Sequence, residues 1–218
     1  MVKNDWETMY EKRKSSLEEA IQLIKSHQKV FLAPFCNEPQ TLVEELVRQR
    51  KRLQNVSLYT AIIGSPCIYA EPDCHSNFKI KTILSSQKFK SALENQVCEY
   101  LPINLSEVSD FIAKTTIDVA LIQVSPPNKE GFCNLGISVD IIPALLKNAI
   151  TIIAQVNQQL PTTNGATLVH VSQIDSFVVS NRSILTISND IPNEIEEEIG
   201  RNVAELISDN ATIQVGVG

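Results

Sequence analysis

Apolar and polar residues alternate along this chain in two kinds of pattern. Short, nearly continuous apolar runs are separated by segments in which apolar residues recur every three or four positions. The first pattern is typical of strands that are buried on both faces, and the second predicts amphipathic helices. Because the two patterns follow one another repeatedly, the sequence predicts an α/β fold with a mostly parallel sheet covered by helices.

The expected elements span most of the chain. We predict strands at 29–33, 56–63, 78–84, 117–124, 150–156, 167–171, 177–179 and 211–215. Helices are expected at about 6–26, 39–47, 87–94, 106–112, 140–148 and 192–208, with Asn37 and Ser106 as N-caps of the second and the fourth. A boundary is expected near Pro192, which gives a main domain at 1–190 and a helix and strand at 191–218 that begin a second domain.

Composition narrows the class of protein. Hydrophobic residues make up 43% of the 218 residues and charged residues 20%, which is typical of a globular chain. A net charge of -6 gives no broad electrostatic reason to bind nucleic acid or an anionic membrane. The N-terminus has no apolar signal segment, and no run is long enough to cross a bilayer. We therefore expect a cytoplasmic protein with no nucleic-acid or membrane partner.

The cysteines and histidines give little sign of a metal site. The chain has five cysteines, an odd number, and no pair has the spacing of a zinc-binding motif. The three histidines are also far apart in sequence. We expect reduced, buried thiols rather than a disulfide framework or a nucleophilic cysteine, and no metal.

The loop after the most apolar strand holds the first candidate site. Ligands of parallel α/β sheets collect outside the carboxyl ends of the strands. The candidate residues in this loop are Ser125, Pro126, Asn128, Gly131 and Asn134, because their polar groups could bind a carboxylate or thioester and their backbone is constrained. The alternative is a rigid connection that binds nothing, and the residues taken alone favour that alternative.

The last residues form a second candidate site. The predicted strand 211–215 is followed by Gly216, Val217 and Gly218. Glycines at such a position allow a tight turn, after which the amide groups of a following helix can bind an anion. We therefore expect the chain to be part of a longer or split protein. The alternative is an edge strand with a two-glycine tail.

The segment Asp118–Asp140, DVALIQVSPPNKEGFCNLGISVD, resembles the hallmark segment of the acetyl-CoA hydrolase/transferase family. That family includes 4-hydroxybutyrate, butyrate and succinate CoA-transferases. The segment Ile153–Asn157 is also similar to the family, and Ala211–Gly218 resembles its QxGIG loop. The resemblance covers essentially the whole chain and implies the N-terminal α/β domain of a CoA-transferase, of the type called NagB/RpiA-like.

The resemblance implies a function as well as a fold. Such enzymes move CoA between an acyl-CoA and a short-chain carboxylic acid through a glutamyl-CoA thioester, and an acyl-CoA hydrolase is a close variant. The glutamate is expected beyond residue 218, so we assign no catalytic residue to this chain and expect it to be inactive alone. Gly216, Val217 and Gly218 carry over as a loop that contacts coenzyme A. The resemblance further implies a C-terminal domain, in cis or as a separate subunit, and a homo-oligomer.

The sequence departs from the family pattern at several positions. Residues 33–39 lack the usual glycines, and the other departures are Asn95 and Asn210 in place of Gly, Asn134 in place of Ser and Thr162 in place of Arg. These departures indicate a divergent member. They also keep a second hypothesis open, in which the chain is a non-catalytic truncated paralogue or the binding subunit of a split enzyme.

Overall fold

The chain divides into two units in a computed structural model that describes residues 5–61, 64–84, 86–186 and 191–215. The first unit is Met1–Thr186 and the second is Ile187–Gly218. The predicted functional boundary at 190/191 stays a prediction.

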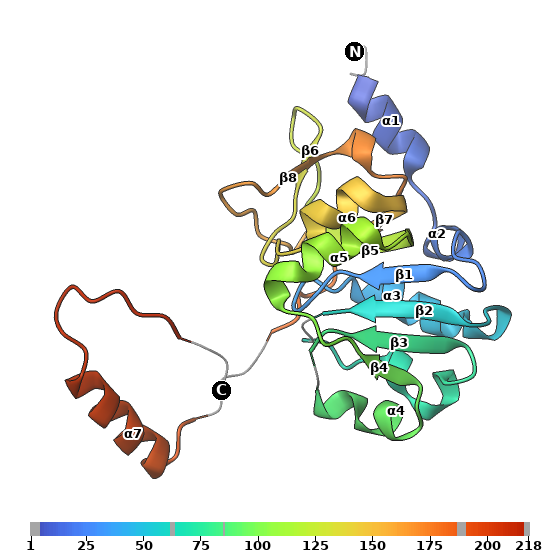
Figure 1. Ribbon diagram of the computed structural model, residues 1–218. Helices are drawn as coiled ribbons and strands as arrows, with labels where there is room; N and C mark the ends of the chain where they lie inside the picture. Colours follow the sequence, from blue (N-terminus) through green and yellow to red (C-terminus); the bar gives the residue numbers. More distant parts are fainter. Residues whose placement is uncertain (1–4, 62–63, 85, 187–190, 216–218) are drawn as a thin grey trace. The chain divides into compact units, whose positions relative to one another are not determined.

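A seven-stranded sheet forms the centre of the first unit (Figure 1), and its strand order is β4-β3-β2-β1-β5-β7-β9. Every neighbouring pair of these strands is parallel. This confirms the predicted α/β fold with a mostly parallel sheet. The strands are β1 (Lys29–Leu32), β2 (Val56–Thr60), β3 (Phe78–Thr82), β4 (Cys98–Tyr100), β5 (Ile117–Val124), β7 (Ala149–Asn157) and β9 (Ser176–Ser180).

Helices cover both faces of the sheet. One face packs against α2 (Leu17–Gln22), α3 (Gln40–Arg48) and α4 (Lys90–Glu94). The other packs against α1 (Asp5–Arg13), α5 (Val108–Lys114) and α6 (Ile142–Asn148). Alternate residues of a strand enter opposite cores, since Val30 lies in the first and Phe31 in the second. The 3-10 turns are η1 (Arg50–Arg52), η2 (Ile68–Ala70), η3 (Pro72–Cys74), η4 (Gln87–Phe89), η5 (Leu105–Glu107) and η6 (Val171–Gln173).

A small antiparallel ribbon stands beside the main sheet. It pairs β6 (Phe132–Asn134) with β8 (Leu168–His170). The strand β6 lies inside the segment 125–136 that the sequence predicted as a loop, and β4 was not predicted. Both are three residues long, too short to produce a readable alternation of apolar and polar residues.

Two predicted helix caps and the extent of one predicted helix were wrong. Asn37 does not cap α3, because Gln155 Oε1 accepts the Thr41 amide of the first turn at 2.9 Å. Ser106 is replaced as a cap by Asn104, which forms a capping box with Glu107. The helix predicted at 6–26 is two helices, since the chain leaves α1 after Arg13 and Ser16 starts α2 with its own capping box.

The second unit contains α7 (Glu194–Glu205), which begins with a capping box between Asn193 and Glu196. The strand predicted at 211–215 was wrong, because these residues have no regular structure. A strand forms only when a neighbour supplies hydrogen bonds, and the described residues of this unit contain no other strand. Within the described ranges, no helix is long and apolar enough to cross a membrane.

Candidate functional site

The order of the strands reverses between β1 and β5, which makes this point a topological switch point of the sheet. The chain runs outward from β1 through β2, β3 and β4, then returns to the other side of β1 and continues through β5, β7 and β9. The loops after β1 and β5 therefore leave the sheet in opposite directions. Ligands of open α/β sheets bind at such a switch point, outside the carboxyl ends of the strands.

A pocket of about 310 Å³ lies at the carboxyl ends of β5 and β7. Four of the predicted residues line it, namely Ser125, Pro126, Asn128 and Asn134. The remaining lining residues are Phe132, Thr162, Thr163, Asn164, Gly165, Thr167 and Leu168. None of these residues is charged, so the pocket presents hydroxyl, amide and apolar groups to a ligand.

Asn134 joins the two loops that form this pocket. Its Nδ2 donates hydrogen bonds to the Thr163 carbonyl at 2.9 Å and to Thr167 Oγ1 at 2.8 Å. Its Oδ1 accepts the Gly136 amide at 2.8 Å. The side chain is buried, so these bonds fix the loop after β5 to the loop after β7. A direct contact between Asn134 and a ligand stays a prediction.

The other predicted residues of this loop also make bonds within it. Ser125 Oγ accepts the Asn134 amide at 2.9 Å. Asn128 Oδ1 accepts the amides of Glu130 and Phe132 at 3.0 and 2.9 Å. These contacts hold the loop in one shape before any ligand arrives.

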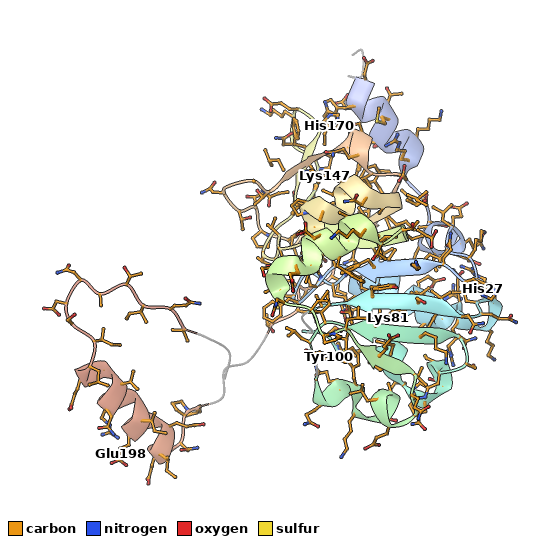
Figure 2. All side chains as sticks on the ribbon, in the orientation of Figure 1. His27, Lys81, Tyr100, Lys147, His170 and Glu198 are labelled. Atoms are coloured by element: carbon orange, nitrogen blue, oxygen red, sulfur yellow. The ribbon has the colours of Figure 1, made fainter. Side chains whose placement is uncertain are left out.

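Gly131 is the one predicted residue that does not line the pocket. It has a φ of +84°, and an added Cβ atom would lie 2.7 Å from Trp6 Cγ and 2.9 Å from His170 Nε2. Figure 2 labels His170 on β8, beside the helix α1 that carries Trp6. Gly131 therefore allows α1 to pack closely on the β6–β8 ribbon.

Buried side-chain amides connect the strand ends at the switch point of the sheet. Gln123 Oε1 accepts hydrogen bonds from Gln155 Nε2 at 2.8 Å and Asn157 Nδ2 at 2.9 Å. From the loop after β1, Asn37 Nδ2 donates to the Leu135 carbonyl at 2.9 Å. The sequence analysis missed this network, although its signal was present as two glutamines inside the predicted apolar strands 117–124 and 150–156.

A buried carboxyl group lies in the loop after β1. Glu38 is 3% exposed and accepts hydrogen bonds from Gln40 Nε2 at 2.7 Å and Tyr69 Oη at 3.4 Å. Burial is the largest influence on Glu38 and raises its pKa to about 7, while hydrogen bonds from Ser65, Gln40 and Tyr69 and the charge of Lys88 act in the opposite direction. Sequence reasoning missed Glu38, because periodicity does not show which loop residues are buried.

The loops after β1 and β2 touch backbone to backbone. A Cβ atom on Gly64 would lie 3.0 Å from the Phe35 carbonyl carbon. Phe35 itself has a φ of 57°, which a glycine would adopt without strain. Within the segment 33–39, where the family usually has glycines, Phe35 thus has a left-handed backbone. Asn210, which also replaces a family glycine, is left-handed as well, with a φ of 65°. Asn95, the third such replacement, has an ordinary φ of -86°.

The thiols are neither paired nor activated. All five cysteines are free and buried, in agreement with the predicted reduced thiols. Burial raises the pKa of Cys133 to about 12, and it is also the main cause that raises Cys74 and Cys98 to a pKa of about 11. Among the described residues, no three metal-binding side chains gather at one point. The predicted coenzyme A loop at Gly216, Val217 and Gly218 lies outside the described residues.

Comparison with known sequences identifies one protein family. Residues 1–189 match the acetyl-CoA hydrolase/transferase N-terminal domain. The chain is 30% identical over 216 residues to the 4-hydroxybutyrate coenzyme A transferase of Clostridium kluyveri, covering 98% of this chain and 50% of that protein. It is 32% identical over 209 residues to a succinyl-CoA:acetate/propanoyl-CoA:succinate CoA transferase of Fasciola hepatica, covering 94% and 43%. The chain thus spans about half the length of the curated relatives it matches.

Solved structures show the same fold. The 4-hydroxybutyrate CoA-transferase of Porphyromonas gingivalis matches with a TM-score of 0.79 and 27% identity, over 98% of this chain and 50% of that chain. RipA from Yersinia pestis matches with a TM-score of 0.90 and 21% identity, over 99% and 53%. The RipA likeness bears on the fold alone.

Proposed function

The chain belongs to the acetyl-CoA hydrolase/transferase family, and from this membership we propose that it is the N-terminal part of an acyl-CoA:carboxylate CoA-transferase. The observation that carries the proposal is the family match over residues 1–189 together with relatives that are all CoA-transferases and are about twice as long. The substrates would be an acyl-CoA and a short-chain carboxylic acid, with coenzyme A carried between them and no metal required.

The proposed reaction passes through a covalent intermediate. A glutamate carboxylate beyond residue 218 attacks the thioester carbonyl, the C–S bond breaks, and CoA leaves as a thiolate. The thiolate then attacks the glutamyl carbonyl of the resulting anhydride, which releases the first acid and leaves a glutamyl-CoA thioester. The incoming acid reverses both steps, so no oxidant, reductant or net proton is consumed.

This half of the protein would supply a rigid wall for that reaction. The loop 125–136 is fixed from within by Ser125 and Asn128 and is tied to the loop after β7 by Asn134. Such preorganisation reduces the cost of holding two reactants in line. The uncharged pocket beside these residues is a suitable place for part of the acyl-CoA or the acid.

The rest of the enzyme would come from a second domain. The apolar face of α7 is exposed, with Ile195 at 71%, Ile199 at 56% and Val203 at 50%, which supports a C-terminal domain that begins near residue 191. This domain could be in cis or a separate subunit. We place Gly216, Val217 and Gly218 in the loop that contacts coenzyme A, and the complete protein in the cytoplasm as a homo-oligomer.

Expression of the complete reading frame tests the proposal. The folded protein should transfer CoA between a short acyl-CoA and acetate. In the absence of an acceptor acid, acyl-CoA should leave a covalent CoA adduct that intact mass spectrometry detects. Folded protein that transfers CoA to no acid of a broad panel and forms no adduct would overturn the enzymatic proposal and favour the binding-subunit hypothesis.

A further inference from the structure

The carboxyl group of Glu38 lies where three loops meet. Gln40 Nε2 at the start of α3 donates to Glu38 Oε1, and Tyr69 Oη in η2 donates to Oε2. The Ser65 side chain also lies close enough to lower the pKa of the Glu38 carboxyl group. These partners belong to the segments after β1, which stands at the switch point of the sheet, and after its neighbour β2.

The segment after β3 joins the same cluster through a lysine. Lys88 Nζ donates to the Ser65 carbonyl at 2.5 Å, and its charge acts on Glu38. Ser65 Oγ also accepts the Cys67 amide at 3.2 Å. The residues Glu38, Gln40, Ser65, Cys67, Tyr69 and Lys88, here called the Glu38 cluster, therefore fix the carboxyl ends of three adjacent strands to one another.

Cys67 and Tyr69 of the Glu38 cluster also belong to the hydrophobic core, but the carboxyl group of Glu38 is not needed to fill that core. A buried carboxyl group costs stability unless it is fully hydrogen-bonded, and an apolar residue would fill the same space without that cost. The neighbouring Thr60 hydroxyl is buried beside the Tyr69 hydroxyl and makes no hydrogen bond of good geometry with the described part of the chain. Polar groups retained at such a cost, at the switch point of the sheet, indicate a role in function.

We propose that Glu38 is a positioning residue of the transferase, whose carboxyl group holds the loops after β1, β2 and β3 in the shape that the bound substrate requires. This inference rests on the proposed function. Glu38 is not assigned to contact the substrate. Glu38 acts through the backbone of the loop after β1. Gly64, in the loop after β2, packs so closely against that backbone that a Cβ atom would lie 3.0 Å from the Phe35 carbonyl carbon.

The charge on Glu38 should set how firmly the loops are held. The titratable groups that face it are Tyr69, Cys67 and Lys88, and burial keeps the first two neutral by raising their pKa values. Hydrogen bonds to a carboxylate are roughly twice as strong as those to a neutral acid. The hydrogen bonds within the cluster are therefore stronger when Glu38 is ionised, although burial makes the ionisation itself cost stability.

A pH profile of the complete enzyme tests this role. For the wild-type protein, kcat/KM should rise to a plateau as pH increases through about 7, the range in which Glu38 loses its proton. Glu38→Gln mimics the protonated acid, so its kcat/KM should stay at the low-pH level throughout and lie about 10- to 100-fold below the wild-type plateau. Tyr69→Phe removes one donor to the carboxylate and should move the rise to higher pH.

Glu45→Gln is the matched control. Glu45 is also on this side of the sheet and is 5% exposed, but it is paired with Arg48 and lies outside the Glu38 cluster. This variant should keep the wild-type pH profile. In parallel, the amide NMR shifts of Cys67 and Tyr69 should titrate with the carboxyl carbon of Glu38 in the wild-type chain and not in Glu38→Gln.

The outcomes separate this inference from the proposed function. Transfer activity whose pH profile is the same in wild type and Glu38→Gln would overturn the positioning role and leave the transferase proposal intact. A folded complete protein without any transfer activity would overturn the transferase proposal itself. The positioning role is supported if kcat/KM and the amide shifts of Cys67 and Tyr69 change over the same pH range in the wild type, and if Glu38→Gln abolishes both changes.

Discussion

Asn134 donates a hydrogen bond of 2.8 Å to Thr167 Oγ1 and so joins two loops that are 33 residues apart in the sequence. The same carboxamide also binds the Thr163 carbonyl and the Gly136 amide. A resemblance to the family marked Asn134 as a departure from the usual serine. In this chain the larger amide reaches across the pocket and binds both of its walls.

Asn134→Ala should destabilise the first unit by about 2–3 kcal/mol, because buried partners lose their hydrogen bonds. Urea unfolding measures the change in the free energy of unfolding. Asn95→Ala is the control, since Asn95 is exposed and bonds only to Ser91 within its own helix. The control should change stability by less than about 0.5 kcal/mol. Equal effects of the two variants would contradict the bridging role of Asn134.

Gly131→Ala should destabilise the protein by more than about 2 kcal/mol, because the new Cβ atom meets both Trp6 and His170 on a left-handed backbone. Gly165→Ala provides the comparison. Gly165 also has a positive φ, of +106°, but an added Cβ atom there has no heavy atom within 4 Å. Its cost should be only the backbone strain, about 1 kcal/mol. The difference between the two melting temperatures reports the packing of α1 on the β6–β8 ribbon.

Stability should depend on pH through Glu38. Its pKa is raised from 4.5 to about 7, so the folded state binds the proton more tightly than the unfolded state. The contribution of Glu38 to the free energy of unfolding is then fully present below about pH 4.5. It is lost as pH rises through 7, a change of about 3 kcal/mol. Urea midpoints between pH 5 and pH 8 should fall in the wild-type chain.

The loss between pH 5 and pH 8 should be absent in Glu38→Gln. Glu45 contributes with the opposite sign, because the hydrogen bond from Arg48 lowers its pKa and its contribution is lost as pH falls through that value. Glu45→Gln should therefore leave the loss between pH 5 and pH 8 unchanged. A urea midpoint of the wild-type chain that does not vary between pH 5 and pH 8 would show that ionisation of Glu38 does not destabilise the fold.

The five thiols should react slowly with a disulfide reagent in the folded chain at pH 8. Each is buried, and burial raises the pKa of Cys133 and Cys67 among them. Unfolding in urea should release all five for rapid reaction. One fast thiol in the folded protein would identify a cysteine that the fold leaves accessible and would reopen the nucleophile hypothesis.

The main architecture could be predicted because strands such as β5 are almost entirely apolar and the helices between them are amphipathic. The hydrogen-bond partner at the start of α3 could not be predicted, since Gln155 comes from a strand more than a hundred residues away and accepts the Thr41 amide in place of a cap at Asn37. Local sequence shows which groups need a partner, but only the packed sheet shows which partner is within reach.

The candidate site was likewise predicted only in part. The loop 125–136 was predicted from its place after the most apolar strand and then supported by the family resemblance, and four of its five chosen residues line the pocket. The Glu38 cluster was not predicted, because its residues lie in three separate segments, after β1, β2 and β3, that carry no motif. Only the order of the strands brings these loops to one place.

The paired amides of Gln123 and Gln155 determine the alignment of two neighbouring strands. They stand opposite each other on β5 and β7, and their side chains are hydrogen-bonded. The residues on either side of Gln123, Ile122 and Val124, enter the core beneath α5 and α6. A slip of one residue would turn an unpaired amide into that apolar core. The two glutamines thus act during folding as a register mark, in strands whose apolar residues would otherwise pair almost equally well in several alignments.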